Sequence, residues 1–231
     1  DDQGRPVAVE VHPGNTADPT TVPSQVEKLR VRFGLEHVVL VGDRGMLTQA
    51  QIAKLREHPE LGWISALRST DIRKLVEGEA LQLSLFDQQD LAQITSPDYP
   101  GERLVACFNP LLKDERRRKR EELLLATEQD LDKIAREAAR RTKTPLGKDA
   151  IGVKVSKVLN RRKMGKHFEL TIEDGGLRYA RKAAAIEKES ALDGVYVIRT
   201  SEPEHKLSAE DTVRSYKSLS QVERAFRCLK G

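Results

Sequence analysis

The sequence has little of what would place it in a membrane, in an oxidising compartment or among zinc proteins. Only two of its 231 residues are cysteines, Cys107 and Cys228, which are too few for a disulfide framework. It contains no CxxC or HExxH spacing, so we expect neither a structural zinc site nor a zinc protease. No stretch reaches the roughly eighteen consecutive apolar residues of a membrane-spanning helix, and the N-terminus lacks the basic-then-apolar layout of a signal peptide. These absences favour a cytoplasmic protein without a membrane partner.

Aromatic residues are also scarce, at 4%, whereas 33% of the residues are charged. The net charge of +4 is unevenly distributed along the chain. Residues 111–166 contain 18 Lys or Arg against 9 Asp or Glu, a net charge of +9 that leaves −5 for the rest. A basic middle segment indicates a polyanionic partner, although a solvated helix held by internal salt bridges would have the same composition.

The first 68 residues predict an alternation of strands and helices, which is typical of an α/β fold. The run HVVLV at 37–41 is continuously apolar, as in strands that are covered on both faces. Asp18 and Thr48 are expected to cap helices, and Gly34 is expected to end the first of them. The expected elements are strands at 7–11, 37–41 and 63–67 and helices at about 18–33 and 48–55.

The pattern changes after residue 68. A single long helix is expected from Pro110 to Arg141, with a final helix capped by Ser208. Between and around these helices the sequence predicts short strands at 81–85, 103–108, 151–155, 168–172 and 195–199.

Asp43 follows the apolar strand 37–41 directly and precedes Arg44-Gly45. Ligands of open α/β sheets bind at the carboxyl ends of the strands, so a carboxylate here is placed to meet a metal ion or a phosphate. An aspartate that only shapes the turn or caps the next helix would fit the same pattern.

The final helix carries Tyr216, Glu223 and Lys230 at intervals of seven residues. Seven residues are close to two helical turns, so these three polar side chains are expected on one ridge. A neighbouring apolar stripe, expected to pack on the sheet, consists of Leu219, Val222, Phe226 and Leu229. An ordinary amphipathic helix with a polar seam is the alternative.

Four segments together resemble the DDE transposases of bacterial insertion sequences, of the insertion-sequence-four type. They are GNTADPTTV at 14–22, VVLVGDRGM at 38–46, DGVYVIRT at 193–200 and the Tyr216/Glu223/Lys230 helix. The resemblance implies an α/β, RNase H-like catalytic core interrupted by a large α+β insertion domain. The expected boundaries are residues 1–68 and 206–231 for the core and 69–205 for the insertion domain.

The resemblance also implies roles for single residues. Asp43 matches the second acid and Glu223 the third acid of a triad that binds two divalent ions, Mg²⁺ or Mn²⁺. Tyr216 and Lys230 match the family's helix signature in identity and spacing and are expected to contact DNA. Leu219 stands where that signature has an arginine, and the nearby arginines that can substitute for it are Arg224 and Arg227.

The first acid of the triad has no clear counterpart, since Asp1 and Asp2 precede Gly4 in what reads as a turn. We therefore expect an internal fragment that does not cut DNA alone.

The implied activity of the whole protein is phosphodiester cleavage and strand transfer at transposon ends. The implied partners are duplex DNA, namely inverted-repeat ends and target, and a second copy in a homodimer. Alternatives are a non-catalytic DNA-binding remnant and another RNase H-like nuclease. The basic run that is expected to bind DNA consists of Arg116, Arg117, Arg118, Lys119 and Arg120.

Overall fold

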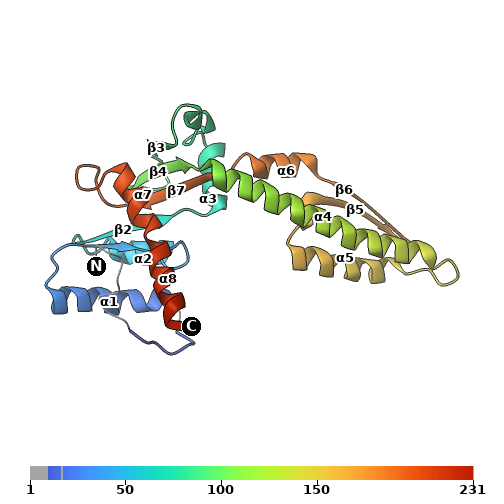
Figure 1. The fold of residues 1–231 in the computed structure, drawn as a ribbon, viewed down its shortest axis with the longest axis horizontal. Helices are drawn as coiled ribbons and strands as arrows, with labels where there is room; N and C mark the ends of the chain where they lie inside the picture. The colour runs from blue at the N-terminus through green and yellow to red at the C-terminus, as the bar shows by residue number, and fades with distance from the viewer. Residues whose placement is uncertain (1–9, 17, 231) are drawn as a thin grey trace. The chain divides into compact units, whose positions relative to one another are not determined.

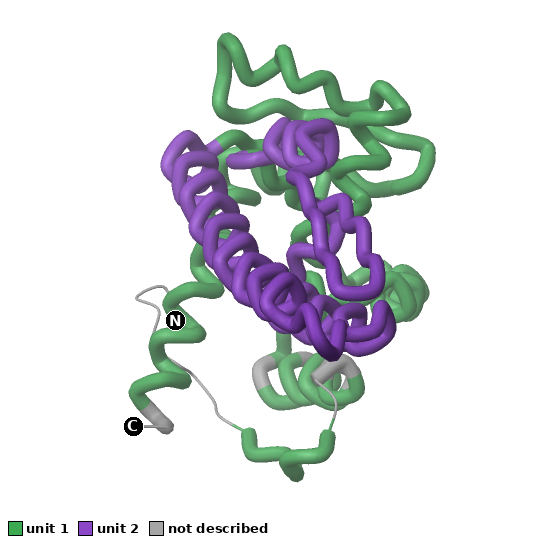
Figure 2. The backbone as a smooth tube through the Cα atoms, turned by 90° about the vertical axis from the view of Figure 1, so that its right-hand side faces the viewer, with its two compact units in different colours: residues 1–108, 195–231 green, residues 109–194 purple. Residues whose placement is uncertain are grey.

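The computed structural model describes residues 10–16 and 18–230 (Figure 1), and it describes only the backbone for Asp18, Pro19, Val22, Pro23, Arg30, Phe33, Leu229 and Lys230. The chain forms two compact units (Figure 2). Unit 1 combines residues 1–108 with residues 195–231, and unit 2 comprises residues 109–194. Unit 2 is therefore inserted in the sequence between two segments that fold together.

Unit 1 is built on a five-stranded mixed sheet with the order β1-β2-β7-β4-β3. Strands β1 and β2 are parallel, and all the other neighbours are antiparallel. Phe108 pairs with Val195, so the chain leaves the sheet for unit 2 and returns to it at paired positions. The strands are β1 (Val38–Val41), β2 (Leu61–Ala66), β3 (Leu91–Ile94), β4 (Arg103–Phe108) and β7 (Val195–Thr200).

Helices cover both faces of this sheet because successive strand residues point to opposite sides. Trp63 packs in a cluster with residues of α1 and α2, whereas its neighbour Ile64 packs with residues of α7. Thr48 caps α2 through its side chain, as expected. The helices of unit 1 are α1 (Asp18–Phe33), α2 (Gln49–Leu55), α3 (Ser69–Glu77), α7 (Ala209–Lys217) and α8 (Leu219–Lys230), with a short 3₁₀ turn η1 (Leu83–Asp87).

Unit 2 centres on the long helix α4 (Pro110–Arg140), close to the bounds expected from the sequence. Leu124, Leu131 and Ala138 recur every seven residues and are buried, so one stripe of α4 faces the core. Asn109 caps this helix through its side chain. The other elements are α5 (Lys148–Arg162), η2 (Gly165–His167), the hairpin β5 (Phe168–Glu173) and β6 (Gly176–Arg181), and α6 (Ala183–Ser190).

Several expectations about single elements were wrong. Residues 151–155 form part of α5, because Ile151 and Val155 lie one helical turn apart and both face the core of unit 2. The strand expected at 81–85 is absent, and η1 begins there at Leu83. Glu10 and Val11 do not belong to a strand, and residues 7–9, like Asp1 and Asp2, lie outside the described residues.

The compact units also differ from the expected domain boundaries of residues 68/69 and 205/206. The helix α3 and strands β3, β4 and β7 were expected in the insertion, but they belong to unit 1. The physical reason is that β4 and β7 pair with each other, and β7 also pairs with β2, in one continuous sheet. Among the described helices, none has the length and the apolar character that crossing a bilayer requires.

Candidate active site

Asp43 lies in the turn that follows β1. Its Oδ1 accepts hydrogen bonds from the backbone N–H groups of Gly45 (2.8 Å) and Met46 (2.7 Å). The turn is tight, since a Cβ at Gly42 would come within 2.9 Å of the Leu47 side chain. The carboxylate is thus held by one oxygen while the side chain stays exposed. Asp43 therefore shapes the turn, as one of the two sequence interpretations expected, and its role as a ligand of a metal ion or a phosphate stays a prediction.

The helix that follows Ser208 does not run unbroken to Lys230, as had been expected. Ser208 accepts from the N–H of Asp211 and caps α7, but this helix ends at Lys217 and α8 begins at Leu219. Near the break, the hydroxyls of Ser218 and Ser220 donate to the carbonyls of Ser215 and Lys217, at 2.7 and 2.8 Å. Serine hydroxyls that bond to the backbone compete with regular helix geometry. Tyr216 and Glu223 therefore stand on two helices, not on one ridge.

A groove of about 820 Å³ nevertheless brings the two predicted acids together. Asp43 enters it from the turn after β1, and Glu223 enters it from α8. Part of its wall is apolar, formed by Met46, Val222 and Phe226. Val222 and Phe226 are about half exposed, so the apolar stripe of α8 faces this groove instead of being buried on the sheet as expected.

Tyr216 is electrostatically coupled to both acids. Its pKa is raised first by burial and then by the negative charges of Asp43 and Glu223, with Arg44 acting in the opposite direction. Its hydroxyl therefore keeps its proton at neutral pH and is a hydrogen-bond donor. Although the helix is broken, the structure places Tyr216, Asp43 and Glu223 within electrostatic reach of one another.

Glu10 is a third carboxylate on the same groove, and no sequence signal singled it out. It accepts hydrogen bonds from the side chains of Gln25 and Lys28 of α1. The bond from Lys28 is the main reason that the pKa of Glu10 is lowered. The negative charge of Glu10 is therefore compensated by α1. Within residues 10–16 and 18–230, no cluster of three or more His, Cys, Asp or Glu side chains is close enough to hold a metal ion.

The remaining residues expected to contact DNA on α8 differ in their surroundings. Arg227 is highly exposed, and its guanidinium lies 3.6 Å from Glu223 Oε2. Arg224 is exposed as well. Leu219 lines the groove at the position where the resembling family has an arginine. The side chain of Lys230 lies outside the part of the chain that the structure describes.

The first and the last arginine of the basic run on α4 are bound within unit 2. Arg120 is only 8% exposed, and its guanidinium pairs with Asp193 and lies 3.9 Å from Glu189. Arg116, one turn earlier, donates to the backbone carbonyl of Leu192 at 3.3 Å. The expectation that Arg120 contacts DNA is therefore corrected, because this side chain is buried and its charge is neutralised by carboxylates of its own unit.

The three residues between these arginines point elsewhere, since they lie on other faces of the helix. Arg117, Arg118 and Lys119 are exposed. Lys119 pairs with Glu115 at 2.5 Å, and Arg118 lies 3.9 Å from Glu122. Exposed pairs of this kind are weak. These three residues therefore remain able to meet an anion.

Comparison with known proteins gives one match. A family model described as "Transposase DDE domain" covers residues 1–231. No curated protein and no solved structure matches the chain. The mixed sheet with helices on both faces is consistent with the RNase H-like core of such a domain. Because the family model spans the whole sequence and the two expected acids line one groove, we conclude that this chain belongs to the family of transposases with a DDE domain.

Proposed function

We propose that the protein cleaves phosphodiester bonds at transposon ends and transfers the strands to target DNA, with Asp43 and Glu223 as metal-binding acids. The observation that supports this proposal is the shared groove, in which two residues with 179 others between them in the sequence come together. In this proposal the chain is of the insertion-sequence-four type, unit 2 is the insertion domain, and the protein acts in the cytoplasm.

The two carboxylates suit a divalent cation such as Mg²⁺ or Mn²⁺. Asp43 uses Oδ1 for the turn, which leaves Oδ2 for a ligand, and Glu223 contacts Arg227 through Oε2, which leaves Oε1. Mg²⁺ is commonly held by one or two carboxylates together with water and substrate phosphates. When bound in pairs, such ions activate the attacking oxygen and stabilise the leaving oxygen of an in-line displacement at phosphorus.

Two neighbouring side chains position the substrate in this proposal. The hydroxyl of Tyr216 carries its proton at neutral pH, as an ordinary tyrosine does, and its raised pKa strengthens this, so it can donate to a phosphate oxygen. Arg227 is 82% exposed, and an ion pair as exposed as its pair with Glu223 is worth little in water. The guanidinium of Arg227 can therefore move from Glu223 to a DNA phosphate at small cost.

Duplex DNA is the proposed partner, with a second copy of the protein holding the other transposon end. Phosphate contacts supply affinity without reading sequence. In unit 2 the proposed contacts are Arg117, Arg118 and Lys119. In unit 1 they are Arg224 and Lys230.

The decisive test is the substitution Glu223→Gln in the intact protein, assayed on a duplex that carries one end of the element. Loss of a metal-binding carboxylate removes several kcal/mol of transition-state stabilisation, so cleavage should fall by at least about a hundredfold. Binding of the same duplex in EDTA should be unchanged. Glu210→Gln is the matched control, because Glu210 is an exposed carboxylate in the first turn of α7 and does not line the groove.

Two results would contradict the proposal. Cleavage at the normal rate by the Glu223→Gln protein would show that this carboxylate does not hold the metal. If the unsubstituted protein binds the duplex but does not cleave it with Mg²⁺ or Mn²⁺, the non-catalytic remnant is the correct description.

A further inference from the structure

Unit 1 contains a second cavity, of about 620 Å³, lined by residues from the starts of α2 and α3, from the loop before β4 and from β7. Its size falls within the range of roughly 300–1,000 Å³ that is typical of pockets for small ligands. Arg44 lines this pocket, whereas the preceding residue, Asp43, lines the acid groove. The two sites therefore meet at the turn after β1.

Three cations of this pocket are available to a ligand. Arg44, Arg68 and Lys74 line it and are exposed. Within the described part of the chain, none of these three side chains makes a hydrogen bond or an ion pair. An anion that enters the pocket therefore does not have to displace a carboxylate from them.

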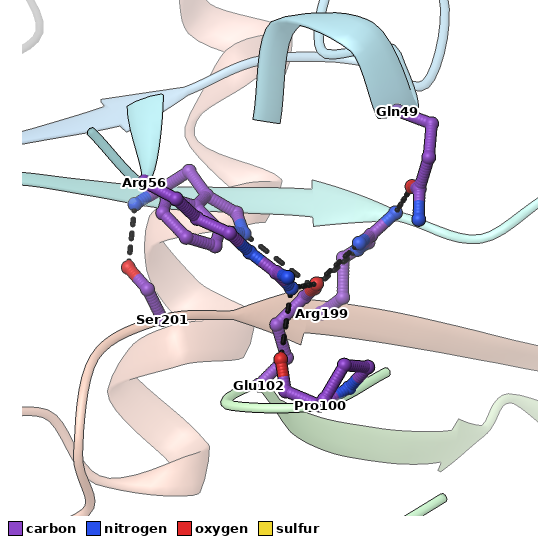
Figure 3. Close-up of polar contacts among 7 residues, drawn as sticks. Gln49, Arg56, Pro100, Glu102, Arg199 and Ser201 are labelled. Carbon is purple, nitrogen blue, oxygen red and sulfur yellow. Dashed lines mark hydrogen bonds and ion pairs between the residues drawn. The ribbon is translucent and has the colours of Figure 1, made fainter. Parts of the chain in front are cut away.

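One wall of the pocket is rigid (Figure 3). Arg199 is 6% exposed and donates two hydrogen bonds of 2.5 Å to the carboxylate of Glu102. Its third contact is a 2.7 Å bond to Oε1 of Gln49 on α2. Glu102 also accepts from Arg56, so the carboxylate is shared between two guanidinium groups. A wall fixed by this many charged hydrogen bonds loses little entropy when a ligand binds.

Tyr99 gives the pocket an aromatic surface. The guanidinium of Arg199 covers its ring at 4.9 Å from the centroid. The pKa of Tyr99 is raised, first by burial and then by the charges of Asp71 and Asp98, which also line the pocket. This part of the pocket therefore combines a π surface with two carboxylate acceptors.

We propose that this pocket holds a single nucleotide of a DNA strand that continues from the acid groove. The phosphate lies against Arg44, Arg68 and Lys74. The base lies beside Tyr99, where Asp71 and Asp98 accept hydrogen bonds from its N–H groups. A bare phosphate would use only the cations and would be repelled by the two carboxylates. The inference rests on the proposed function for its ligand class, since DNA is the substrate proposed for the groove.

The test compares DNA affinity at several salt concentrations, in EDTA, for a fluorescent twelve-nucleotide single strand of mixed sequence and for a duplex of arbitrary sequence. Removing two of the three cations around this phosphate with Arg68→Gln plus Lys74→Gln should lower the salt slope for the single strand by up to about 0.7, since each neutralised phosphate contributes about 0.7. The matched control is Lys54→Gln plus Lys206→Gln. It makes the same charge change at two exposed lysines of unit 1 that do not line the pocket.

The contact with the base is tested separately at Tyr99. Tyr99→Leu should weaken single-strand binding about tenfold through lost stacking, and Tyr99→Phe should retain the affinity because it keeps the ring. If Tyr99→Phe and Tyr99→Leu weaken binding equally, the ring does not stack on a base and the nucleotide assignment is wrong.

Other outcomes also overturn the proposal. An equal slope for the pocket variant and its control shows that no phosphate enters the pocket. A change of the salt slope that is confined to the duplex shows that these cations contact the phosphates of a duplex that stays outside the pocket. Because all binding is measured in EDTA, these results do not depend on cleavage. Pocket variants that bind normally while Glu223→Gln abolishes cleavage would refute the pocket and leave the proposed function intact.

Discussion

Two groups of basic residues differ in how much of their charge is free. On α4 of unit 2, Arg116 and Arg120 are bound to unit 2 itself, and Lys119 pairs with Glu115. In unit 1, Arg44, Arg68 and Lys74 come from separate parts of the sequence and surround a single pocket. The dense run is conspicuous in the sequence, yet the dispersed group leaves more unpaired charge. Local charge density therefore does not measure the charge that a polyanion can reach.

The largest effect expected from this comparison concerns the buried pair of unit 2. Replacing Arg120 with Ala leaves the Asp193 carboxylate buried without its partner, which typically costs about 3–5 kcal/mol. Arg117→Ala should change stability by no more than about 0.5 kcal/mol, since its side chain is exposed. Amide hydrogen exchange of the α4 and α6 peptides in the whole chain measures both effects. Equal protection in the two variants would show that Arg120 is no more important to the fold than its exposed neighbour.

This pair also shows where prediction from the sequence stops. The long helix from Pro110 to Arg141 was predicted from the local sequence, and α4 (Pro110–Arg140) confirms it. Arg120 and Asp193 are 73 residues apart, and no local pattern indicates that they meet. The run was therefore interpreted as one surface, although the helical turn places its first and last arginines against residues 192 and 193.

The same limit applies to unit 1. The strands β1, β2 and β7 were correctly predicted from the local sequence, β1 from a continuously apolar run, because a buried strand is a local signal. The order of the strands is not local, and β4 and β7, which lie in the segment predicted as the insertion, pair within the sheet of unit 1. Of the site, the positions of Asp43 and Glu223 were predicted from a resemblance. The break at Ser218, the groove beside Glu10 and the pocket at Arg44 depend on packing that only the folded chain reveals.

The second prediction asks whether the exposed half of the α4 run binds DNA. Changing Arg117, Arg118 and Lys119 together to Gln should lower the salt slope of duplex binding by about 2 to 3 if all three meet phosphates, since each contact contributes about 0.9. Stability should hardly change, because their pairs with Glu122 and Glu115 are exposed. Titration of duplex binding between low and moderate salt measures the slope. An unchanged slope would mean that the whole run serves unit 2 or faces solvent.

The smallest expected effect is a dependence on acid within unit 2, at the contact between α4 and α5. The carboxylate of Asp130 accepts from Arg162 at 2.8 Å, from Arg161 at 2.6 Å and from Lys133 at 3.2 Å. The hydrogen bond from Arg162 is the main cause of the lowered pKa of Asp130, which falls from the ordinary 3.8 to about 2. Since the folded state holds the charged form more strongly, this stabilisation is present above about pH 4 and is lost as the pH falls towards 2.

Asp130→Asn should therefore cost about 1 kcal/mol at neutral pH, and the difference from the unsubstituted protein should shrink as the pH falls through about 2. Denaturant titrations followed by circular dichroism across this range measure the difference. Glu173→Gln is the control, because Glu173 pairs with the exposed Arg178 of the same hairpin, and an exposed pair of that kind adds little to stability. If Asp130→Asn shows no pH dependence beyond that of the control, the basic residues of α5 remain as available to DNA as the cations of unit 1. The two units would then differ in where their basic residues lie, and not in how strongly these residues are paired with carboxylates.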